Sequence, residues 1–473
     1  MKMYQFLSLV DGTSLENIKP DSVTFVTPSG KFDVVVADSG VLAVLTRLNT
    51  GQLSEQEVMH LALLEGGFTS ITNTLSCLNL LYKKKVLLRR LWHNNSPILT
   101  IFPLASACTL SVVEIQEDDD FVSSRFAYCR HDQNTTLLES PTSHESIIFH
   151  SWPAVALWSE LRSPTSVKTL ALSFPDLPIQ LIRAIITNLF SANFILRSSP
   201  SCETLEETPP LCLWEFHDLL FHARSRLGRH SNPYGGTYRF RNKIEPLPAA
   251  KPQLGLPTIL FDKIDRSQID SQNIPFIRVL DNRKSIRNHG DEVLSKEELG
   301  MFLFLTARTK EIFDTPYGQL SRRPYPSGGA SYELEIYVLV NRCTSIPKAL
   351  YHYCPLKHAL FRVADQNEYT HALLESAWHT VQRESRPHVL LIITSRIGRV
   401  SWKYQSIAYS LILKHVGVLV QTMYLVATQL GLAPCALGGG DSDLFSLASG
   451  INYYEETSVC EFILGKPTPS IDS

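Results

Sequence analysis

The segment from Trp402 to Asp441 reads WKYQSIAYSLILKHVGVLVQTMYLVATQLGLAPCALGGGD, and it combines three different features. It opens on the pair Lys403-Tyr404, whose side chains can both carry a proton. The apolar, periodic stretch from Tyr409 to Leu430 then predicts one long helix. The segment ends in three consecutive glycines, which let backbone amides point at a ligand without side-chain obstruction. A proton-handling pair, a rigid helix and a glycine loop thus lie close together along the chain.

The composition indicates a folded protein of more than one domain. The chain has 473 residues, too many for one ordinary core, so two or three domains are expected. Its 44% hydrophobic and 19% charged residues are typical of globular proteins. A net charge of −2 argues against bulk attraction to nucleic acid or anionic membranes. The most apolar run, Val416 to Val426, is interrupted by Gln421 and Thr422, so no membrane span is expected.

The nine cysteines are scattered and form no Cys-x-x-Cys pair. An odd number of isolated thiols in a long chain fits a reducing compartment, and no secretory signal is visible at the N-terminus. We therefore predict a cytoplasmic protein without a metal site.

The first 200 residues contain a weak internal sequence repeat. Leu81–Arg89 aligns without a gap to Leu189–Arg197, and an amphipathic helix precedes each copy. The predicted apolar stripes are Ile71, Leu75, Leu78 and Leu81 in the first copy and Ile182, Ile185, Ile186 and Leu189 in the second. Helices followed by a turn and a strand predict two winged-helix-like domains, at residues 1–100 and 101–200. Coincidence between two helix-to-strand turns remains the alternative.

These domains carry little sign of DNA binding. Lys83 to Lys85 form one basic cluster, but Glu117 to Asp120 are acidic and the second copy is nearly uncharged. Because phosphate neutralisation dominates affinity for DNA, no nucleic-acid partner is expected.

Residues 201–269 read as a connector with proline-rich ends and one amphipathic helix, Leu213 to Arg226. Residues 270–473 then alternate helix and strand signals. The expected elements are a helix capped by Ser295 and Glu298, the long helix from Tyr409, and strands at Leu334–Val340, Val389–Ile393 and Val459–Leu464. This pattern predicts an α+β domain.

Two further motifs in this domain are suited to binding a ligand. Arg283, Ser285 and Arg287 offer forked donors and a hydroxyl, which suit a phosphate and a sugar-like chain, although a solvated loop is the alternative. Ser327, Gly328 and Gly329 precede a strand and let backbone approach a flat ring closely, although a simple turn is the alternative. Tyr351-His352-Tyr353 line either a pocket or the core, and Cys435 is expected to be a small buried residue.

Taken in order over residues 210–465, these motifs resemble the nitroreductase-fold SagB-type azoline dehydrogenases. With two winged-helix-like domains in front, the chain is most similar to the cyanobactin thiazoline oxidases. The resemblance implies a flavin mononucleotide (FMN), with Arg283, Ser285 and Arg287 at its phosphate and ribityl oxygens. It also implies that Ser327 to Gly329 and Leu437, Gly438 and Gly439 cradle the flavin ring. Lys466 is the one residue of the short tail that could reach the phosphate.

The same resemblance assigns the chemistry to Lys403 and Tyr404. Aromatising a thiazoline sends a hydride to the flavin and a proton to a base. A free lysine, with a pKa of about 10.4, is a poor base at neutral pH, and burial would lower that value. Tyr404 would orient the lysine or relay the proton.

The expected partners are an azoline-containing peptide, dioxygen as electron acceptor and a second copy of the chain in a homodimer. The N-terminal domains would hold a leader peptide as an added strand. An NAD(P)H-dependent nitro- or flavin-reductase and a non-catalytic peptide scaffold are the alternatives. The role of Arg224-Ser225-Arg226 in the connector stays open.

Overall fold

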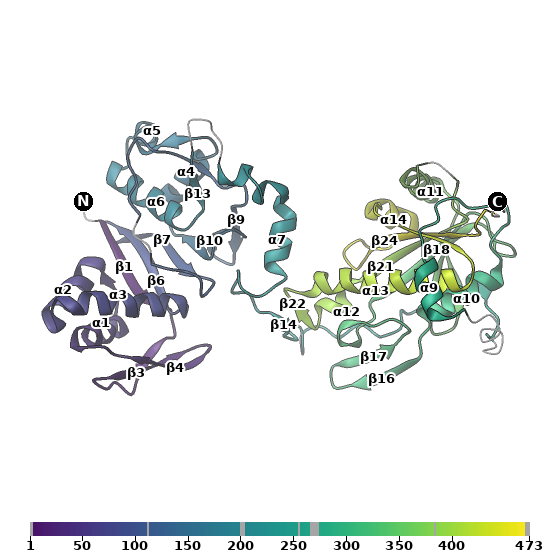
Figure 1. The fold of residues 1–473 in the computed structure, drawn as a ribbon, viewed down its shortest axis with the longest axis horizontal. Coiled ribbons are helices and arrows are strands. Elements are labelled where there is room, and N and C mark those ends of the chain that lie inside the picture. Colours follow the sequence, from purple (N-terminus) through teal and green to yellow (C-terminus); the bar gives the residue numbers. More distant parts are fainter. Residues whose placement is uncertain are drawn as a thin grey trace. The chain divides into compact units, whose positions relative to one another are not determined.

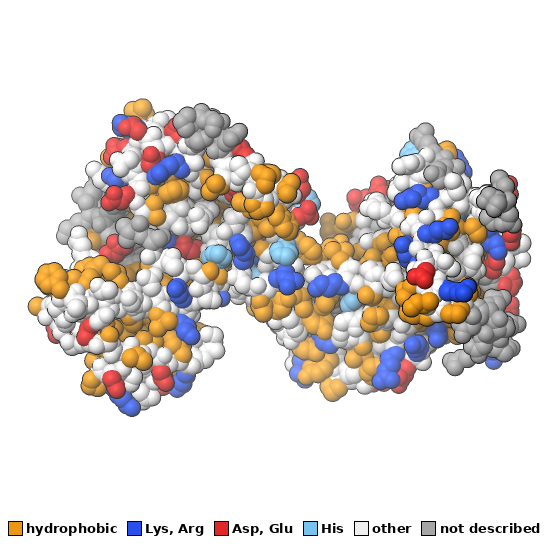
Figure 2. All heavy atoms as spheres, in the orientation of Figure 1, with side chains coloured by type: hydrophobic (Ala, Val, Ile, Leu, Met, Phe, Trp, Pro, Cys, Tyr) orange, Lys and Arg blue, Asp and Glu red, His pale blue; other side chains and the backbone are white. Residues whose placement is uncertain are grey.

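The computed structural model describes residues 3–110, 113–198, 204–253, 256–264, 274–382 and 385–468. The chain divides into two compact units, Met1–Asn232 and Pro233–Ser473 (Figure 1). Figure 2 shows acidic and basic side chains interspersed with hydrophobic ones on the surface of both units.

The first half of unit one contributes three helices and four adjacent strands at one end of a seven-stranded sheet. Its helices are α1 (Ser39–Thr50), α2 (Glu55–Gly66) and α3 (Phe68–Lys83). The sheet has the order β5-β1-β6-β7-β11-β10-β9. Its strands from this half are β1 (Met3–Leu9), β5 (Leu53–Ser54), β6 (Leu87–His93) and β7 (Ser96–Pro103). A separate sheet contains β2 (Ser14–Glu16), β3 (Ser22–Thr27) and β4 (Gly30–Val35).

The second half of unit one repeats the same order of elements. Its helices are α4 (Trp152–Glu160), α5 (Val167–Ser173) and α6 (Ile179–Ser191), followed by β13 (Ile195–Arg197). β13 and β12 (Thr165–Ser166) both pair with β8 (Asp120–Ser123). Strands β9 (Tyr128–Asp132), β10 (Thr135–Glu139) and β11 (Glu145–Phe149) complete the large sheet. Each half thus runs helix, short strand, helix, helix, strand, in agreement with the predicted winged-helix pattern, and the domain bounds inside the unit stay predictions.

The internal sequence repeat corresponds to two matching turns, one between α3 and β6 and one between α6 and β13. Lys85 and Asn193 occupy equivalent positions, and both adopt a left-handed backbone, with φ of 62° and 59°. In each copy the next residue donates its amide to a helix carbonyl, Val86 to Leu81 at 3.1 Å and Phe194 to Leu189 at 3.0 Å. One predicted stripe position is wrong: Leu75 is 40% exposed rather than buried.

The connector helix is shorter than predicted and belongs to unit one. Helix α7 spans Phe216–Arg224, and its last residue pairs with Glu139 on β10 at 2.6 Å. Arg224 also donates to the hydroxyl of Tyr128 at 2.5 Å. These contacts fasten α7 to the β9–β10 hairpin, so Arg224 has a structural role within unit one.

Unit two is built on a second seven-stranded sheet, with the order β15-β20-β19-β18-β21-β24-β23. Its strands are β15 (Ile259–Leu260), β18 (Leu334–Val340), β19 (Ala349–Cys354), β20 (Ala359–Asp365), β21 (Val389–Arg396), β23 (Ala433–Leu437) and β24 (Glu456–Gly465). The helices are α9 (Phe276–Asn282), α10 (Lys296–Ala307), α11 (Glu368–Thr380), α12 (Ile397–Ser401), α13 (Ala408–Gln429) and α14 (Ser442–Ser449). Two small ladders join β14 (Gly235–Gly236) to β22 (Tyr404–Gln405) and β16 (Glu311–Thr315) to β17 (Gly318–Arg322).

Both faces of this sheet are covered, as the continuous apolar strands predict. Ile336 and Val338 of β18 pack into the cluster that contains residues of α10 and α13, while Tyr337 and Leu339 pack into the cluster of α11 and α14 (Figure 1). Tyr351 and Tyr353 are buried in the first cluster, so the core interpretation of that aromatic motif is the correct one.

Helix α13 is long and apolar enough to cross a membrane by length and composition, with a mean hydropathy of 1.5. In the structure one face of α13, from Ile412 through Leu419 and Met423 to Ala427, is part of the buried core of unit two. This packing assigns the helix a core role and explains why it is apolar.

The capping box at α10 is present as predicted. The Ser295 hydroxyl accepts from the Glu298 amide at 3.1 Å, and the Glu298 carboxylate accepts from the Ser295 amide at 3.0 Å. We predict that Ser295→Ala lowers the free energy of unfolding by about 1 kcal/mol, because the hydroxyl no longer satisfies that amide. Urea unfolding measures the change, with Ser295→Thr as the control that keeps a capping oxygen. Equal losses in both variants would contradict the assignment.

Candidate active site

Lys403 and Tyr404 lie beside the Ser327–Gly329 loop. They follow α12, and Tyr404 pairs with Gly236 in the small ladder. The Lys403 ammonium nitrogen lies 3.5 Å from the carbonyl oxygen of Gly329 and 5.2 Å from the ring centroid of Tyr404. A Cβ added at Gly329 would overlap both the Lys403 Nζ and the Tyr404 hydroxyl, and Gly329 has a left-handed φ of 62°. The structure therefore brings together two motifs that lie far apart in the sequence, and only glycine fits between them.

A buried histidine holds this loop from behind. The Gly328 amide donates to His415 Nε2 at 2.6 Å, and His415 Nδ1 lies 2.7 Å from Glu333 Oε1. Because Nε2 accepts, the proton of the neutral ring must sit on Nδ1 and point at the carboxylate. Glu333 and His415 are both buried. Sequence reasoning missed this pair, although a histidine on the apolar face of the predicted helix was a visible signal.

The Arg283–Arg287 segment lies against the strand that leads to the glycine loop. The Ser285 and Tyr424 hydroxyls are 2.8 Å apart, and the Tyr424 hydroxyl accepts from the Ala436 amide of β23 at 2.8 Å. The Arg283 guanidinium lies 5.5 Å from the Tyr424 ring centroid. The side chains of Arg283 and Arg287 are exposed, and no carboxylate among the described residues pairs with either. Two guanidinium groups therefore remain available to an anion beside β23.

The glycine loop is open. Leu437 is the last residue of β23, and Gly438 to Gly440 are exposed. A Cβ at Gly438 would meet nothing within 4 Å, and one at Gly439 would meet only Thr380, at 3.8 Å. Behind the loop, a Cβ at Gly440 would lie 3.4 Å from Glu461 Oε1. This buried carboxylate oxygen has no hydrogen-bond partner among the described residues.

Two other predicted ligand residues are engaged within the protein. The Ser327 hydroxyl accepts from the Tyr332 amide at 3.0 Å. Lys466 pairs with Glu298 at 2.6 Å and with Glu292 at 3.1 Å. The hydrogen bond that Lys466 donates to Glu298 raises the pKa of Lys466. A phosphate contact by Lys466 stays a prediction, and it would compete with two carboxylates. Cys435 is buried, and burial raises its pKa, as expected of a residue that fills space.

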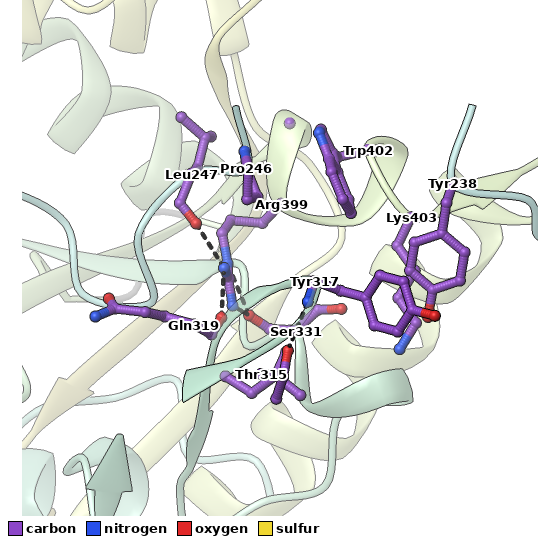
Figure 3. Close-up of a pocket in the computed structure, with 12 residues that line it drawn as sticks. Tyr238, Pro246, Leu247, Thr315, Tyr317, Gln319, Ser331, Arg399, Trp402 and Lys403 are labelled. Carbon is purple, nitrogen blue, oxygen red and sulfur yellow. Dashed lines mark hydrogen bonds between the residues drawn. The ribbon is translucent and has the colours of Figure 1, made fainter. Parts of the chain in front are cut away.

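A cavity of about 110 Å³ adjoins Lys403 (Figure 3). Its lining includes Tyr238, Tyr317, Trp402, Arg399 and Lys403. Tyr238 and Tyr317 are stacked with ring centroids 4.5 Å apart. This cavity could not be predicted from local motifs, because its walls come from the connector and the β16–β17 hairpin as well as from the predicted motifs.

Comparison with known proteins identifies the family to which the C-terminal part of the chain is similar. The model of the nitroreductase family matches residues 280–466. The protein named "Putative nitroreductase MJ1384" from Methanocaldococcus jannaschii is 31% identical over 172 residues, which cover 36% of this chain and 81% of that protein. The chain belongs to the nitroreductase family. Its α+β unit two is therefore the nitroreductase domain predicted from the motifs.

Other matches lie among peptide-modifying proteins. The model described as cyanobactin oxidase ThcOx matches residues 121–231, in unit one. The microcin B17-processing protein McbC from Escherichia coli is 35% identical over 125 residues, covering 25% of this chain and 45% of McbC. These matches agree with the resemblance to SagB-type azoline dehydrogenases.

Among solved structures, a protein of Ralstonia eutropha described as a "putative nitroreductase" has a TM-score of 0.35 at 19% identity. The match covers 50% of this chain and 99% of that one. The E. coli microcin synthetase McbBCD complex with truncated pro-MccB17 bound has a TM-score of 0.33 at 22% identity, covering 52% of this chain and 90% of that one.

Glu461 gives a prediction for the pH dependence of stability. Burial, with a smaller effect of Asp441, raises the pKa of this carboxyl from 4.5 to about 7. The folded chain therefore keeps this proton after the unfolded chain has lost it, and the stability contributed by this group falls as the pH rises from 4.5 to about 7. We predict that Glu461→Gln gains up to about 3 kcal/mol of unfolding free energy over the parent at pH 8.

The gain should shrink towards zero as the pH falls below 4.5, where this carboxyl is protonated in both states of the parent. Urea unfolding across this range measures the difference, with the exposed Glu245→Gln as a control that shows no pH-dependent gain. A gain for Glu461→Gln that did not change with pH would contradict the assignment.

Proposed function

We propose that this protein is an FMN-dependent oxidase that converts thiazolines, and oxazolines where present, in a ribosomally made, modified peptide into thiazoles and oxazoles. Dioxygen would reoxidise the cofactor. The convergence of Lys403 and Tyr404 on Gly329 carries the proposal, because it brings a candidate base and a second proton-carrying group to the loop expected beside the flavin ring. Membership of the nitroreductase family and the similarity to McbC support it.

The residues present fit FMN. Arg283 and Arg287 supply guanidinium groups without a carboxylate partner in the described part of the chain, and Ser285 supplies a hydroxyl, which match a phosphate and its sugar chain. Gly438 and Gly439 leave backbone uncovered where a ring would lie, and Gly328 and Gly329 carry the loop on which the candidate base lies. Leu437 would add its backbone at the end of β23. When bound, the flavin accepts a hydride from the substrate carbon.

The chain's own residues then handle the proton. Lys403 lies beside the Gly329 carbonyl, so its amine is held at the loop rather than free in solvent. In its neutral form the amine takes the proton that the azoline ring carbon loses as the ring becomes aromatic. The Tyr404 hydroxyl, which approaches the same point over Gly329, orients the amine or relays the proton. The buried His415 keeps the loop in place through its contact with the Gly328 amide.

The second candidate is an NAD(P)H-dependent nitro- or flavin-reductase. The match to a nitroreductase-named protein over 81% of that protein's length favours it. A reductase receives its hydride from nicotinamide and needs no protein base, so it gives no role to Lys403. The two candidates therefore differ in which compound reduces the flavin.

Lys403→Ala should retain the yellow cofactor but lose turnover of a thiazoline peptide by at least about a hundredfold, because general-base catalysis typically contributes that much. The measurement is the visible spectrum under anaerobic conditions, before and after the peptide is added. Arg287→Ala is the matched contrast: it should weaken FMN binding and leave Lys403 in place. Full activity in Lys403→Ala, or bleaching by NADPH alone in the parent protein, would move the protein to the reductase class.

The proposal extends to the N-terminal unit as a holder of the leader segment of the peptide. β1 pairs with β5 only at Phe6 and Leu7, which leaves the neighbouring edge at Met3 to Gln5 without a strand partner among the described residues. An extended peptide can add to such an edge. A cavity of about 280 Å³, lined in part by Gln5 and Leu7, lies next to it and would accept a side chain of the added strand. The proposed enzyme is a homodimer.

On this basis, the leader segment of the substrate should protect the amides of β1 from hydrogen exchange, because an added strand hydrogen-bonds them. Exchange measured by mass spectrometry, with and without the leader peptide, tests this. Peptides covering β16–β17 serve as the internal control. Binding of the leader without protection of residues 3–9 would rule out this edge.

A further inference from the structure

The cavity beside Lys403 has room for one side chain rather than a whole ligand. Its volume is about 110 Å³, whereas pockets for complete small molecules are roughly 300–1,000 Å³. It opens next to the candidate base, so a peptide whose azoline lies at Lys403 would place a neighbouring group in it. The lining residues come from the connector, the β16–β17 hairpin and the α12 region of unit two (Figure 3).

Three aromatic rings shape the cavity for a flat group. Tyr238 stacks on Tyr317 with 28° between the ring planes, and it meets Trp402 edge to face at 82° with centroids 5.9 Å apart. In Figure 3 Tyr238, Tyr317 and Lys403 lie close together at one side of the cavity. Aromatic walls of this kind favour another ring, which gains stacking or edge contacts in addition to burial.

The charges of the lining exclude a cationic guest. The lining contains Arg399 and Lys403, while none of its residues is Asp or Glu. Arg399 is buried, and it donates four hydrogen bonds, all to carbonyl oxygens: to Leu247 at 2.7 Å, Gln319 at 2.9 Å and Ser331 at 3.1 and 2.7 Å. A guanidinium has five N–H donors, so one remains unused among the described residues. A lysine or arginine side chain would enter beside the positive charge of Arg399 and the amine of Lys403, with no carboxylate among the lining residues to pair with it.

A carboxylate guest conflicts with the chemistry at Lys403. A negative charge in contact with the amine would favour the ammonium form and so oppose its role as a base. An uncharged ring with an acceptor atom avoids both problems, because it can stack on the tyrosines and accept from Arg399.

We propose that this cavity binds a flat, uncharged ring of the substrate peptide next to the azoline that reacts, and that an azole formed earlier in the same peptide suits it best. This inference rests on the proposed function and adds a specificity site to it. It also implies an order of events: each azole that forms favours binding of the azoline beside it, so oxidation proceeds between neighbours.

Binding separates this inference from turnover. Five peptides carry a central, unreactive thiazole and differ only in the flanking position, which holds a second thiazole, Phe, Ala, Lys or Asp. Titration calorimetry with the flavin-loaded protein gives their dissociation constants. The flanking thiazole should bind about five- to tenfold more tightly than Ala, as a favourable aromatic contact allows. Phe should follow the thiazole, and Lys should bind most weakly. Equal affinity for thiazole and Ala, or tightest binding of Asp, overturns the inference.

Tyr317→Ala tests the wall of the cavity. Tyr317 is 42% exposed in the turn between β16 and β17, so the variant should fold. It should lose most of the preference for the thiazole flank over Ala. Tyr454→Ala is the matched control, since Tyr454 is 85% exposed and does not line the cavity, and it should keep the full preference. An unchanged preference in Tyr317→Ala also overturns the inference.

The reactive peptide with an Ala flank distinguishes the two levels of the proposal. If its azoline bleaches the flavin while the flanking ring has no effect on affinity, the cavity assignment fails and the proposed function stands. If no azoline peptide bleaches the flavin, the proposed function fails and the inference falls with it.

Discussion

Every part of the candidate site depends on the position of helix α13. Its N-terminus follows Lys403 and Tyr404, His415 on its buried face accepts from the Gly328 amide, and Tyr424 further along joins Ser285 to the Ala436 amide. The chain then turns through Gly431 into β23 and the glycine loop. Because an α-helix rises about 1.5 Å per residue and is stiff, these contacts lie at fixed distances along one rod. The apolar face that buries α13 in the core of unit two therefore also sets the geometry of the site.

A second constraint is the group of charges buried beneath the Ser327–Gly329 loop. Arg323, Arg396 and Arg399 lie near Glu333 and Glu335, and all five are buried. The pKa of Glu335 is held at about 2, against the effect of burial, chiefly by its contact with His352 and by the two nearby arginines Arg323 and Arg396. Burial lowers the pKa of Arg399 to about 10, with Arg396 and Arg323 adding to the effect. Arg396 and Glu335 form an ion pair at 3.5 Å, and removing either one would leave the other charge buried without this partner, which is costly in a core. Arg399 connects the group to the loop above it, because it donates to the Ser331 carbonyl.

Much of the fold could be predicted from local patterns. The strand Leu334–Val340, the capping box at Ser295 and the long helix all depend on neighbouring residues, and all are present. The site is different, because Gly329, Lys403 and His415 come from separate segments, and their meeting depends on tertiary packing. The motifs could be predicted individually through a family resemblance. The Glu333–His415 pair and the aromatic cavity could not, since a buried histidine or a tyrosine in a hairpin turn has no sequence pattern of its own.

The placement of Lys403 outside a regular helix follows from what the site requires. α12 ends at Ser401 and α13 begins at Ala408, so the pair lies in the short segment between them, in which Tyr404 begins β22. That segment is tied at both sides: the Trp402 indole donates to the Ile244 carbonyl at 2.6 Å, and the Tyr238 amide donates to the Lys403 carbonyl at 3.2 Å. A lysine on an exposed helix face would lose its position through rotamer freedom. Here the connector fixes the backbone of Lys403, and the missing side chain of Gly329 gives its amine one place to lie. The connector is therefore part of the candidate site as much as the nitroreductase domain that follows it.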